Sequence, residues 1–113
     1  MKLIYRFLAA VVALTICSGA HSETAVCVGT VKTVAHHASG WVVIAVGPST
    51  SILMCNLDTQ SFVTSTQSCK AYLALALAVQ AQNKSGTLYV DNAPTTNCAD
   101  IPFFHQANTR YFQ

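Results

Sequence analysis

The chain of 113 residues is long enough for one small domain besides an export segment. Charge is sparse, because only 9% of the residues are charged and the formal net charge is +2. Lys2 and Arg6 account for that excess, so the rest of the chain is close to neutral. Because no basic patch remains for a phosphate backbone or an anionic membrane surface, we expect no nucleic-acid partner.

An export signal is predicted over residues 1–22. It begins with the basic residues Lys2 and Arg6 and continues with an apolar core over residues 7–17. This core is short for a membrane span of about 20 residues, and small residues follow it. We therefore expect a secreted or periplasmic protein with no membrane span.

Two cleavage sites could remove this signal. Cleavage after Ser22 is favoured over cleavage after Ala20, and it leaves a single domain over residues 23–113. A lipoprotein, with an acylated Cys17 at the start of the mature chain, is the competing interpretation. Cleavage after Ser22 is the position we adopt for the domain boundary.

An even number of cysteines remains in the mature chain: Cys27, Cys55, Cys69 and Cys98. In a short exported chain this predicts two disulfides, which compensate for a thin core. The spacing contains no C-x-x-C pair, so we expect no metal site. Three pairings are possible, and we favour Cys55–Cys98 together with Cys27–Cys69.

Strands are predicted before the central helix, over residues 25–35, 41–46 and 50–57. The first is rich in Val and Thr with partial alternation, and the second is a continuous apolar run. A turn that ends in Gly40 joins these two into a hairpin. A polar loop over residues 58–64 then leads to the helix.

A long helix is predicted over residues 65–86. Ser65 or Thr66 can cap its start by accepting a backbone N–H, and Gly86 stands where a left-handed residue commonly ends a helix. The face expected to pack on the core holds Tyr72, Leu73, Leu75, Ala76, Leu77 and Val79. This is the only helix expected in the mature chain.

The opposite side of this helix carries Lys70 and a series of alanines, namely Ala71, Ala74, Ala78 and Ala81. An exposed helix normally presents Glu, Lys and Gln to water, although alanine is also simply a good helix former. A smooth strip of this kind leaves room for the close approach of a neighbouring copy. We therefore expect the four alanines to form an oligomer interface.

Further short strands are predicted after the helix, over residues 87–91, 101–104 and 109–112, with a loop over residues 92–97. The order is then three strands, a helix, and two or three strands. The OB-fold has this layout. We expect a mainly β fold, an OB-fold-like five-stranded barrel with the helix between strands 3 and 4.

Aromatic rings on the strands and in the C-terminal loop give the main indication of ligand recognition, since OB-folds bind oligosaccharides and stack rings on such side chains. The rings on the strands and in this loop are those of Trp41, Tyr89, Phe103, Phe104, Tyr111 and Phe112. We expect most of them to lie in the barrel core. Phe103 and Phe104 are the exceptions, because adjacent strand residues face opposite sides and one must point outward. Together with His105 and Gln106 they form the predicted ligand site.

Catalytic patterns are lacking in the sequence, which has no G-x-S-x-G, no H-E-x-x-H and no closely spaced pair of carboxylates. His36 and His37 fall in the predicted turn, where adjacent side chains point apart. His105 lies in a loop without a partner close in sequence. We expect a protein that is not an enzyme and that carries no cofactor.

Two segments resemble the B subunits of subtilase cytotoxin and typhoid toxin, namely VCVGTVKTVAHHASGWVVIAV and ILMCNLDTQSFVTSTQSCKAYLALALAVQAQNKSGTLYVDN. Together they cover most of the mature chain. The resemblance implies an OB-fold, a ring of five subunits with the helices around a pore, a glycan site on the barrel flank and a secreted A-chain partner. Those subunits read sialylated glycans with residues before the first Cys-bearing strand, where this chain has only Glu23, Thr24 and Ala25 ahead of Val26 and Cys27. The resemblance therefore does not imply that this chain binds sialic acid with residues that match those of the toxin subunits.

These features together predict a secreted, toxin B-subunit-like protein that forms a homo-oligomer and recognises a glycan or a protein partner. The alternative is a monomeric periplasmic or envelope accessory protein, or an inhibitor. The mass in solution distinguishes the two, because a five-membered ring has roughly five times the mass of a monomer.

Overall fold

The computed structural model describes residues 22–113, so the predicted export signal, apart from Ser22, lies outside the described residues, as does Cys17. The elements follow in the order β1 (Glu23–His36), β2 (Trp41–Val46), β3 (Ile52–Asn56), α1 (Thr66–Ala81), β4 (Ser85–Ala93), the 3-10 helix η1 (Cys98–Asp100) and β5 (Thr109–Phe112). In this part of the chain no helix is both long and apolar enough to cross a membrane.

The predicted mainly β fold is confirmed, with α1 between β3 and β4. Two strands, β2 and β5, have the bounds that the sequence predicts. The strand predicted over residues 101–104 is wrong, because these residues form a turn after η1. Phe104 there has a φ of 60°, which lies in the left-handed region and cannot be part of an extended strand.

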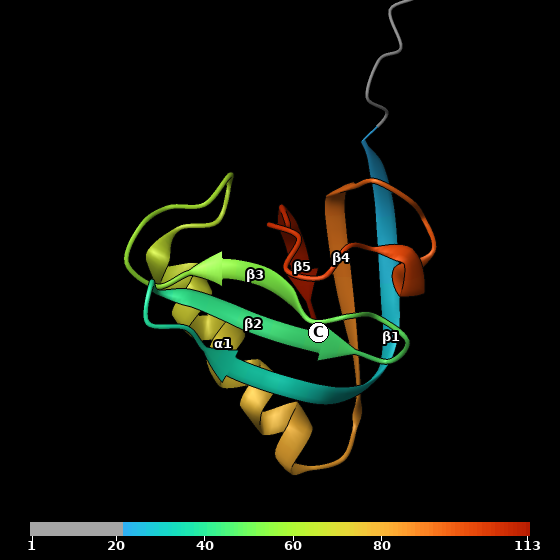
Figure 1. Ribbon diagram of the computed structural model, residues 1–113. Coiled ribbons are helices and arrows are strands. Elements are labelled where there is room, and N and C mark those ends of the chain that lie inside the picture. Colours follow the sequence, from blue (N-terminus) through green and yellow to red (C-terminus); the bar gives the residue numbers. More distant parts are fainter. Residues whose placement is uncertain (1–21) are drawn as a thin grey trace, which may run out of the picture.

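The long strand β1 is shared by both halves of the sheet. It runs beside β4 and then curves beneath β2 (Figure 1), which gives the strand order β3-β2-β1-β4-β5 with all neighbours antiparallel. The change of partner is abrupt, because Thr30 pairs with Ser85 of β4 while Val31 pairs with Val46 of β2. One strand thereby bends a single sheet around a common core.

The two edge strands of this sheet approach each other without forming a full ladder. Leu53 of β3 donates its N–H to the carbonyl of His105 and accepts the N–H of Ala107, both at 2.9 Å. This parallel bridge and a hydrogen bond from the Thr109 hydroxyl to the Met54 carbonyl join β3 to the segment that ends in β5. The result is a curved five-stranded sheet that does not close completely, in an OB-fold-like arrangement.

The core is built from the inward-facing residues of every strand. Val42, Ile44 and Val46 of β2 point into this core, and Val43 and Ala45 between them are also largely covered, at 7% and 5% exposure. The largest fully buried side chains are those of Ile44, Ile52, Met54, Leu88, Ile101, Val42, Val46 and Val90.

The ends of α1 follow from local hydrogen bonds. The Ser65 side chain accepts the backbone N–H of Ser68 at 3.1 Å, which confirms one of the two predicted caps. The predicted end at Gly86 is wrong. Asn83 takes the left-handed position instead, with a φ of 53°, and the N–H of Lys84 reaches back to the carbonyl of Val79.

The face of α1 that packs on the barrel is narrower than predicted. Cys69 and Ala76, seven residues apart, are fully buried, and Tyr72, Leu73 and Val79 pack beside them. The prediction that Leu75 and Leu77 belong to the core face is wrong, because they are 39% and 48% exposed. The disulfide at Cys69 fixes the rotation of the helix about its axis, and this rotation turns both leucines outward.

Two disulfides are present, as the cysteine count predicts, but their pairing differs from the one favoured. Cys27 pairs with Cys98 and Cys55 pairs with Cys69. The first joins the middle of β1 to η1, and the second joins the end of β3 to the first turn of α1. Such bonds are typical of extracellular and periplasmic proteins.

The two disulfides are expected to differ in their contribution to stability. In the chain-entropy view the cost of opening a bridge rises with the loop that it closes, and the separations are 71 and 14 residues. We expect Cys27→Ala with Cys98→Ala to lower the free energy of unfolding by about 4 kcal/mol, and Cys55→Ala with Cys69→Ala by about 3 kcal/mol. Urea denaturation of the two double variants checks this, and a larger loss for the shorter loop would contradict it.

Candidate functional site

A pocket of about 140 Å³ opens on the outer face of β2 and β3, and we call it the β2–β3 pocket. It lies between the loop that joins β1 to β2 and the turn that follows η1. Its walls are formed by His37, Ser39, Trp41, Val43, Leu53 and Phe104. OB-folds bind oligosaccharides and oligonucleotides on this face and with loops at these places.

The strands place the apolar part of the pocket by simple alternation. Val42 and Ile44 point into the core, so Trp41 and Val43 lie on the opposite face of the same strand, where Val43 forms the floor of the pocket and is only 7% exposed. Val43 pairs with Leu53 across the ladder, which puts the two side chains next to each other on the outer face. The base of the pocket is therefore aliphatic, with an indole beside it.

The β1–β2 loop supplies the polar part. The backbone N–H of Ser39 donates to Nδ1 of His37 at 3.1 Å, and the Ser39 hydroxyl lies 2.7 Å from the same nitrogen. The N–H of His37 donates to the carbonyl of Trp41, which closes the loop. A short, internally bonded loop thus holds an imidazole and a hydroxyl at the rim.

The four residues predicted to bind a ligand lie in and next to the turn after η1, on the side of the pocket opposite the β1–β2 loop. Only Phe104 among them lines the pocket. Phe103 and Phe104 are 64% and 49% exposed with ring centroids 4.0 Å apart, so both rings, rather than one, face outward. The N–H of Phe104 donates to the carbonyl of Ser51, which holds its ring beside the pocket. His105 is half-buried and Gln106 forms the bridge to Leu53.

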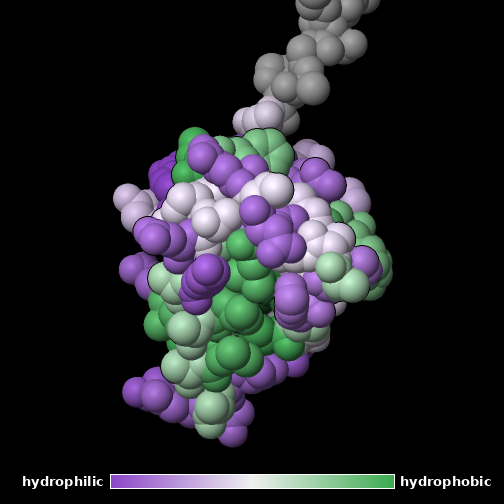
Figure 2. All heavy atoms as spheres, turned by 90° about the vertical axis from the view of Figure 1, so that its left-hand side faces the viewer, coloured by the Kyte–Doolittle hydropathy of each residue, from purple (hydrophilic) through white to green (hydrophobic). Residues whose placement is uncertain are grey.

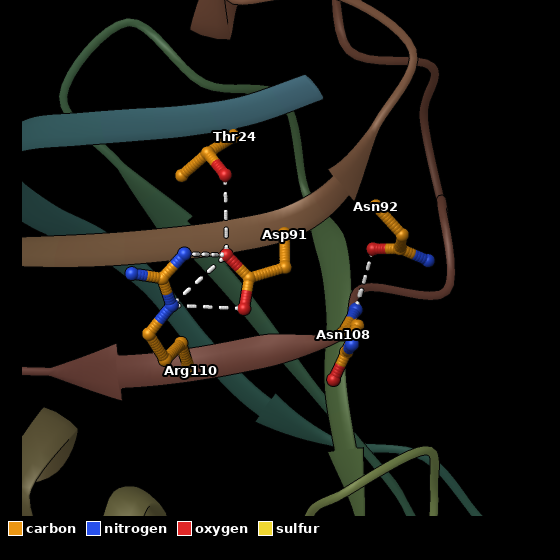
Figure 3. Close-up of polar contacts among 5 residues, drawn as sticks. All are labelled: Thr24, Asp91, Asn92, Asn108 and Arg110. Carbon is orange, nitrogen blue, oxygen red and sulfur yellow. Dashed lines mark hydrogen bonds and ion pairs between the residues drawn. The ribbon is translucent and has the colours of Figure 1, made fainter. Parts of the chain in front are cut away.

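Asn92 braces the turn that carries these residues. Its Nδ2 donates to the carbonyl of Gln106 at 2.9 Å, and its Oδ1 accepts the N–H of Asn108 (Figure 3). Its carbonyl lies 3.1 Å from Nε2 of His105. His105 is therefore engaged in holding the turn, and its ring is less available to a ligand than the sequence suggests.

A short polar row links β1, β4 and β5 beside this brace. Arg110 donates to both carboxylate oxygens of Asp91, and the hydroxyl of Thr24 donates to the same carboxylate (Figure 3). The hydrogen bonds from Arg110 hold the pKa of Asp91 below its ordinary value. The charges of this row are thus paired with each other and lie outside the pocket lining.

Of the aromatic rings expected in the core, only Phe112 is buried, so that expectation is wrong for the others. Tyr89 and Tyr111 are a cross-strand pair with edge-to-face rings 5.8 Å apart on the outer face of β4 and β5. Val26 pairs with Tyr89 from β1, and both Val26 and Val28 are exposed. This outer face of β1, β4 and β5 is a second surface able to contact a partner.

The outward side of α1 is a third apolar surface, which we call the α1 strip: Ala71, Ala74, Leu75, Leu77, Ala78 and Ala81. Figure 2 views the molecule from the α1 side and shows a continuous apolar area there, bordered by polar residues. The four alanines of the predicted oligomer interface are all exposed. Their part in assembly stays a prediction.

Residues 22–113 hold no group of three or more His, Cys, Asp or Glu side chains close enough to bind a metal ion. The four cysteines of this range are engaged in disulfides. The side chains of His36 and His37 do not form a joint site, because His36 is the last residue of β1 and His37 lines the pocket.

Comparisons of the chain with protein-family models, with curated proteins and with solved structures find no match. The site therefore has to be argued from its own geometry.

Sequence reasoning missed most of the pocket lining. The continuous apolar run over residues 41–46 correctly suggests a largely buried strand, but it does not reveal that Trp41 and Val43 share the face opposite the core. The pairing of Val43 with Leu53 depends on the register between β2 and β3. A signal was present in Trp41, a large amphipathic residue that directly follows a turn with two polar side chains.

The Asp91–Arg110 pair is expected to make stability depend on acid pH. The pKa of Asp91 is lowered on folding, so its contribution is present above the unfolded value of about 3.9 and is lost as the pH falls through the folded value. Asp91→Asn should therefore lower the urea midpoint at pH 7 and converge with wild type below about pH 4. Asp58→Asn, an equal change of charge without an arginine partner, is the control. A constant difference between Asp91→Asn and wild type across this range would contradict the assignment.

Proposed function

We propose that this protein is a secreted, non-enzymatic binding protein that recognises a glycan or a protein partner through the β2–β3 pocket. The observation that carries the proposal is the placing of Trp41 and Phe104 around an open pocket on the outer face of β2 and β3. Aromatic rings beside a few polar groups are the usual means of binding a sugar or an apolar side chain on an OB-fold.

Two features near the pocket support a binding role. Phe104 is a bulky residue held in the left-handed region, and strain of this kind concentrates at functional sites. The turn that carries it is fixed at both ends, by Cys98 through a disulfide and by Asn92 through hydrogen bonds. A pre-organised rim loses little entropy when a ligand binds.

We also propose that the protein self-associates through the α1 strip, in the manner implied by its resemblance to toxin B subunits. Leu75 and Leu77 add exposed aliphatic area to the alanines, so the strip is more apolar than the sequence suggests. Exposed apolar area of this kind often marks a protein interface. The sparse charge of the domain favours association as well. A secreted A-chain is the further partner that the resemblance implies.

Removal of a pocket ring is expected to weaken ligand binding. On a glycan array, Trp41→Ala and Phe104→Ala should each bind about tenfold more weakly than wild type, because one stacking contact contributes roughly 1–3 kcal/mol. Tyr111→Ala, which removes an exposed ring from the outer face of β5, is the matched control and should bind normally. Loss of binding in the control alone would move the site to that face.

A charge placed on the α1 strip is expected to weaken assembly without unfolding the subunit. Ala74→Glu and Ala78→Glu should keep the far-ultraviolet spectrum of wild type but shift the sedimentation coefficient toward that of a monomer, because burying an unpaired charge is costly. Thr96→Glu, in an exposed loop far from α1 in sequence, should assemble normally.

Sedimentation of the unaltered protein separates the two proposed forms. A wild-type protein that sediments as a monomer would contradict self-association and favour the monomeric accessory protein or inhibitor. Normal assembly of both glutamate variants would show that the α1 strip faces water.

A further inference from the structure

The lining of the β2–β3 pocket is uncharged, and this restricts the ligand class. None of the six described residues that line it is Lys, Arg, Asp or Glu. Arg110, the arginine of the polar row, is paired with Asp91 and lies outside the pocket lining. A carboxylate or a phosphate placed in this pocket would lose water without gaining a fixed cation, which is unfavourable.

The polar groups at the rim form one donor and one acceptor. Because the backbone N–H of Ser39 donates to Nδ1 of His37, that nitrogen is the acceptor and Nε2 carries the ring proton. The Ser39 hydroxyl then donates to Nδ1 as well, which leaves its oxygen free to accept. No contact among the described residues uses the Nε2 proton of His37.

The apolar groups match the rest of a small ring compound. Val43 and Leu53 lie side by side on the outer face, and Trp41 and Phe104 add aromatic surfaces. The volume of about 140 Å³ is close to that of an engineered cavity of about 150 Å³ that holds one benzene molecule, so the open pocket admits an acetamido group with part of a sugar ring.

We propose that the β2–β3 pocket binds the acetamido group and pyranose ring of an uncharged N-acetylhexosamine. The acetamido carbonyl accepts from Nε2 of His37, its N–H donates to Oγ of Ser39, and its methyl group rests on Val43 and Leu53. The sugar ring stacks on Trp41. This inference rests on the proposed function and names the ligand class of the same site.

An acetamido group also occurs in sialic acid, and the uncharged lining distinguishes the two sources. N-acetylneuraminic acid carries a carboxylate, for which the pocket has no cation. A hexose has a hydroxyl in place of the acetamido group, so it offers no methyl group to Val43 and Leu53. A neutral N-acetylated sugar satisfies both restrictions.

The test uses Trp41, the only tryptophan of the chain, as an internal reporter. Its fluorescence and its indole N–H resonance are followed as wild-type protein is titrated with methyl glycosides of N-acetylglucosamine, N-acetylgalactosamine, glucose and N-acetylneuraminic acid. We expect a saturable change with at least one N-acetylhexosaminide. The glucoside and the sialoside should each bind at least about tenfold more weakly, because the first lacks the acetamido group and the second brings an unpaired charge.

Two serine variants link the effect to the rim. Ser39→Ala should reduce the affinity for the N-acetylhexosaminide to that for the glucoside, whereas Ser85→Ala, an exposed serine outside the pocket, should leave it unchanged. Tighter binding of the sialoside, equal binding of the glucoside, or no response of Trp41 to any sugar would each overturn the inference.

Failure of this inference can be told apart from failure of the proposed function. If an array ligand of another class still requires Trp41 and Phe104, the pocket is the site and only its ligand class is wrong. If neither substitution affects any binding, both the site and the ligand class fail.

Discussion

The close contact between Gly29 of β1 and Gly47 after β2 is the constraint on which the rest of the structure depends. A Cβ on Gly29 would lie 2.5 Å from the Cα of Gly47, and a Cβ on Gly47 would collide with the carbonyl of Val28. Both glycines have positive φ values, of 152° and 55°, which side chains disfavour. The two backbones can therefore approach at the place where β1 leaves β4 and joins β2, and this approach allows one sheet to curl into a barrel.

The curl determines where the β2–β3 pocket forms. Once β2 lies across the barrel, its outer face and that of β3 are flanked by the β1–β2 loop and by the turn after η1. The Cys27–Cys98 bond ties that turn to the middle of β1, and Asn92 holds it from β4. Pocket walls that are far apart in sequence are thus fixed by the same strand that shapes the core, which is how an OB-fold builds a site from its loops.

The sequence was sufficient for the order of the five strands and of α1, because strand alternation, the capping serine and the uninterrupted helical run are local signals. It also predicted a strand over residues 101–104 that does not form, and it did not predict η1. It was insufficient where a long-range contact decides. The disulfide pairing depends on how β1 and β3 sit relative to η1 and α1, and the outward position of Leu75 and Leu77 depends on the Cys55–Cys69 bond. The end of α1 was missed because Asn83, rather than a glycine, adopts the left-handed conformation.

For the candidate site, the sequence indicated the segment but not the side chains that meet. Phe104 was expected at the site, whereas its partners Trp41 and Leu53 are brought to it by the register of β2 and β3 and by the bridge from Leu53 to Gln106. A crystal structure of the protein with its tightest array ligand tests the central claim most directly. The account predicts ligand density between Trp41 and Phe104 on the outer face of β2 and β3. Density on the outer face of β1, β4 and β5, beside Tyr89 and Tyr111, would contradict it.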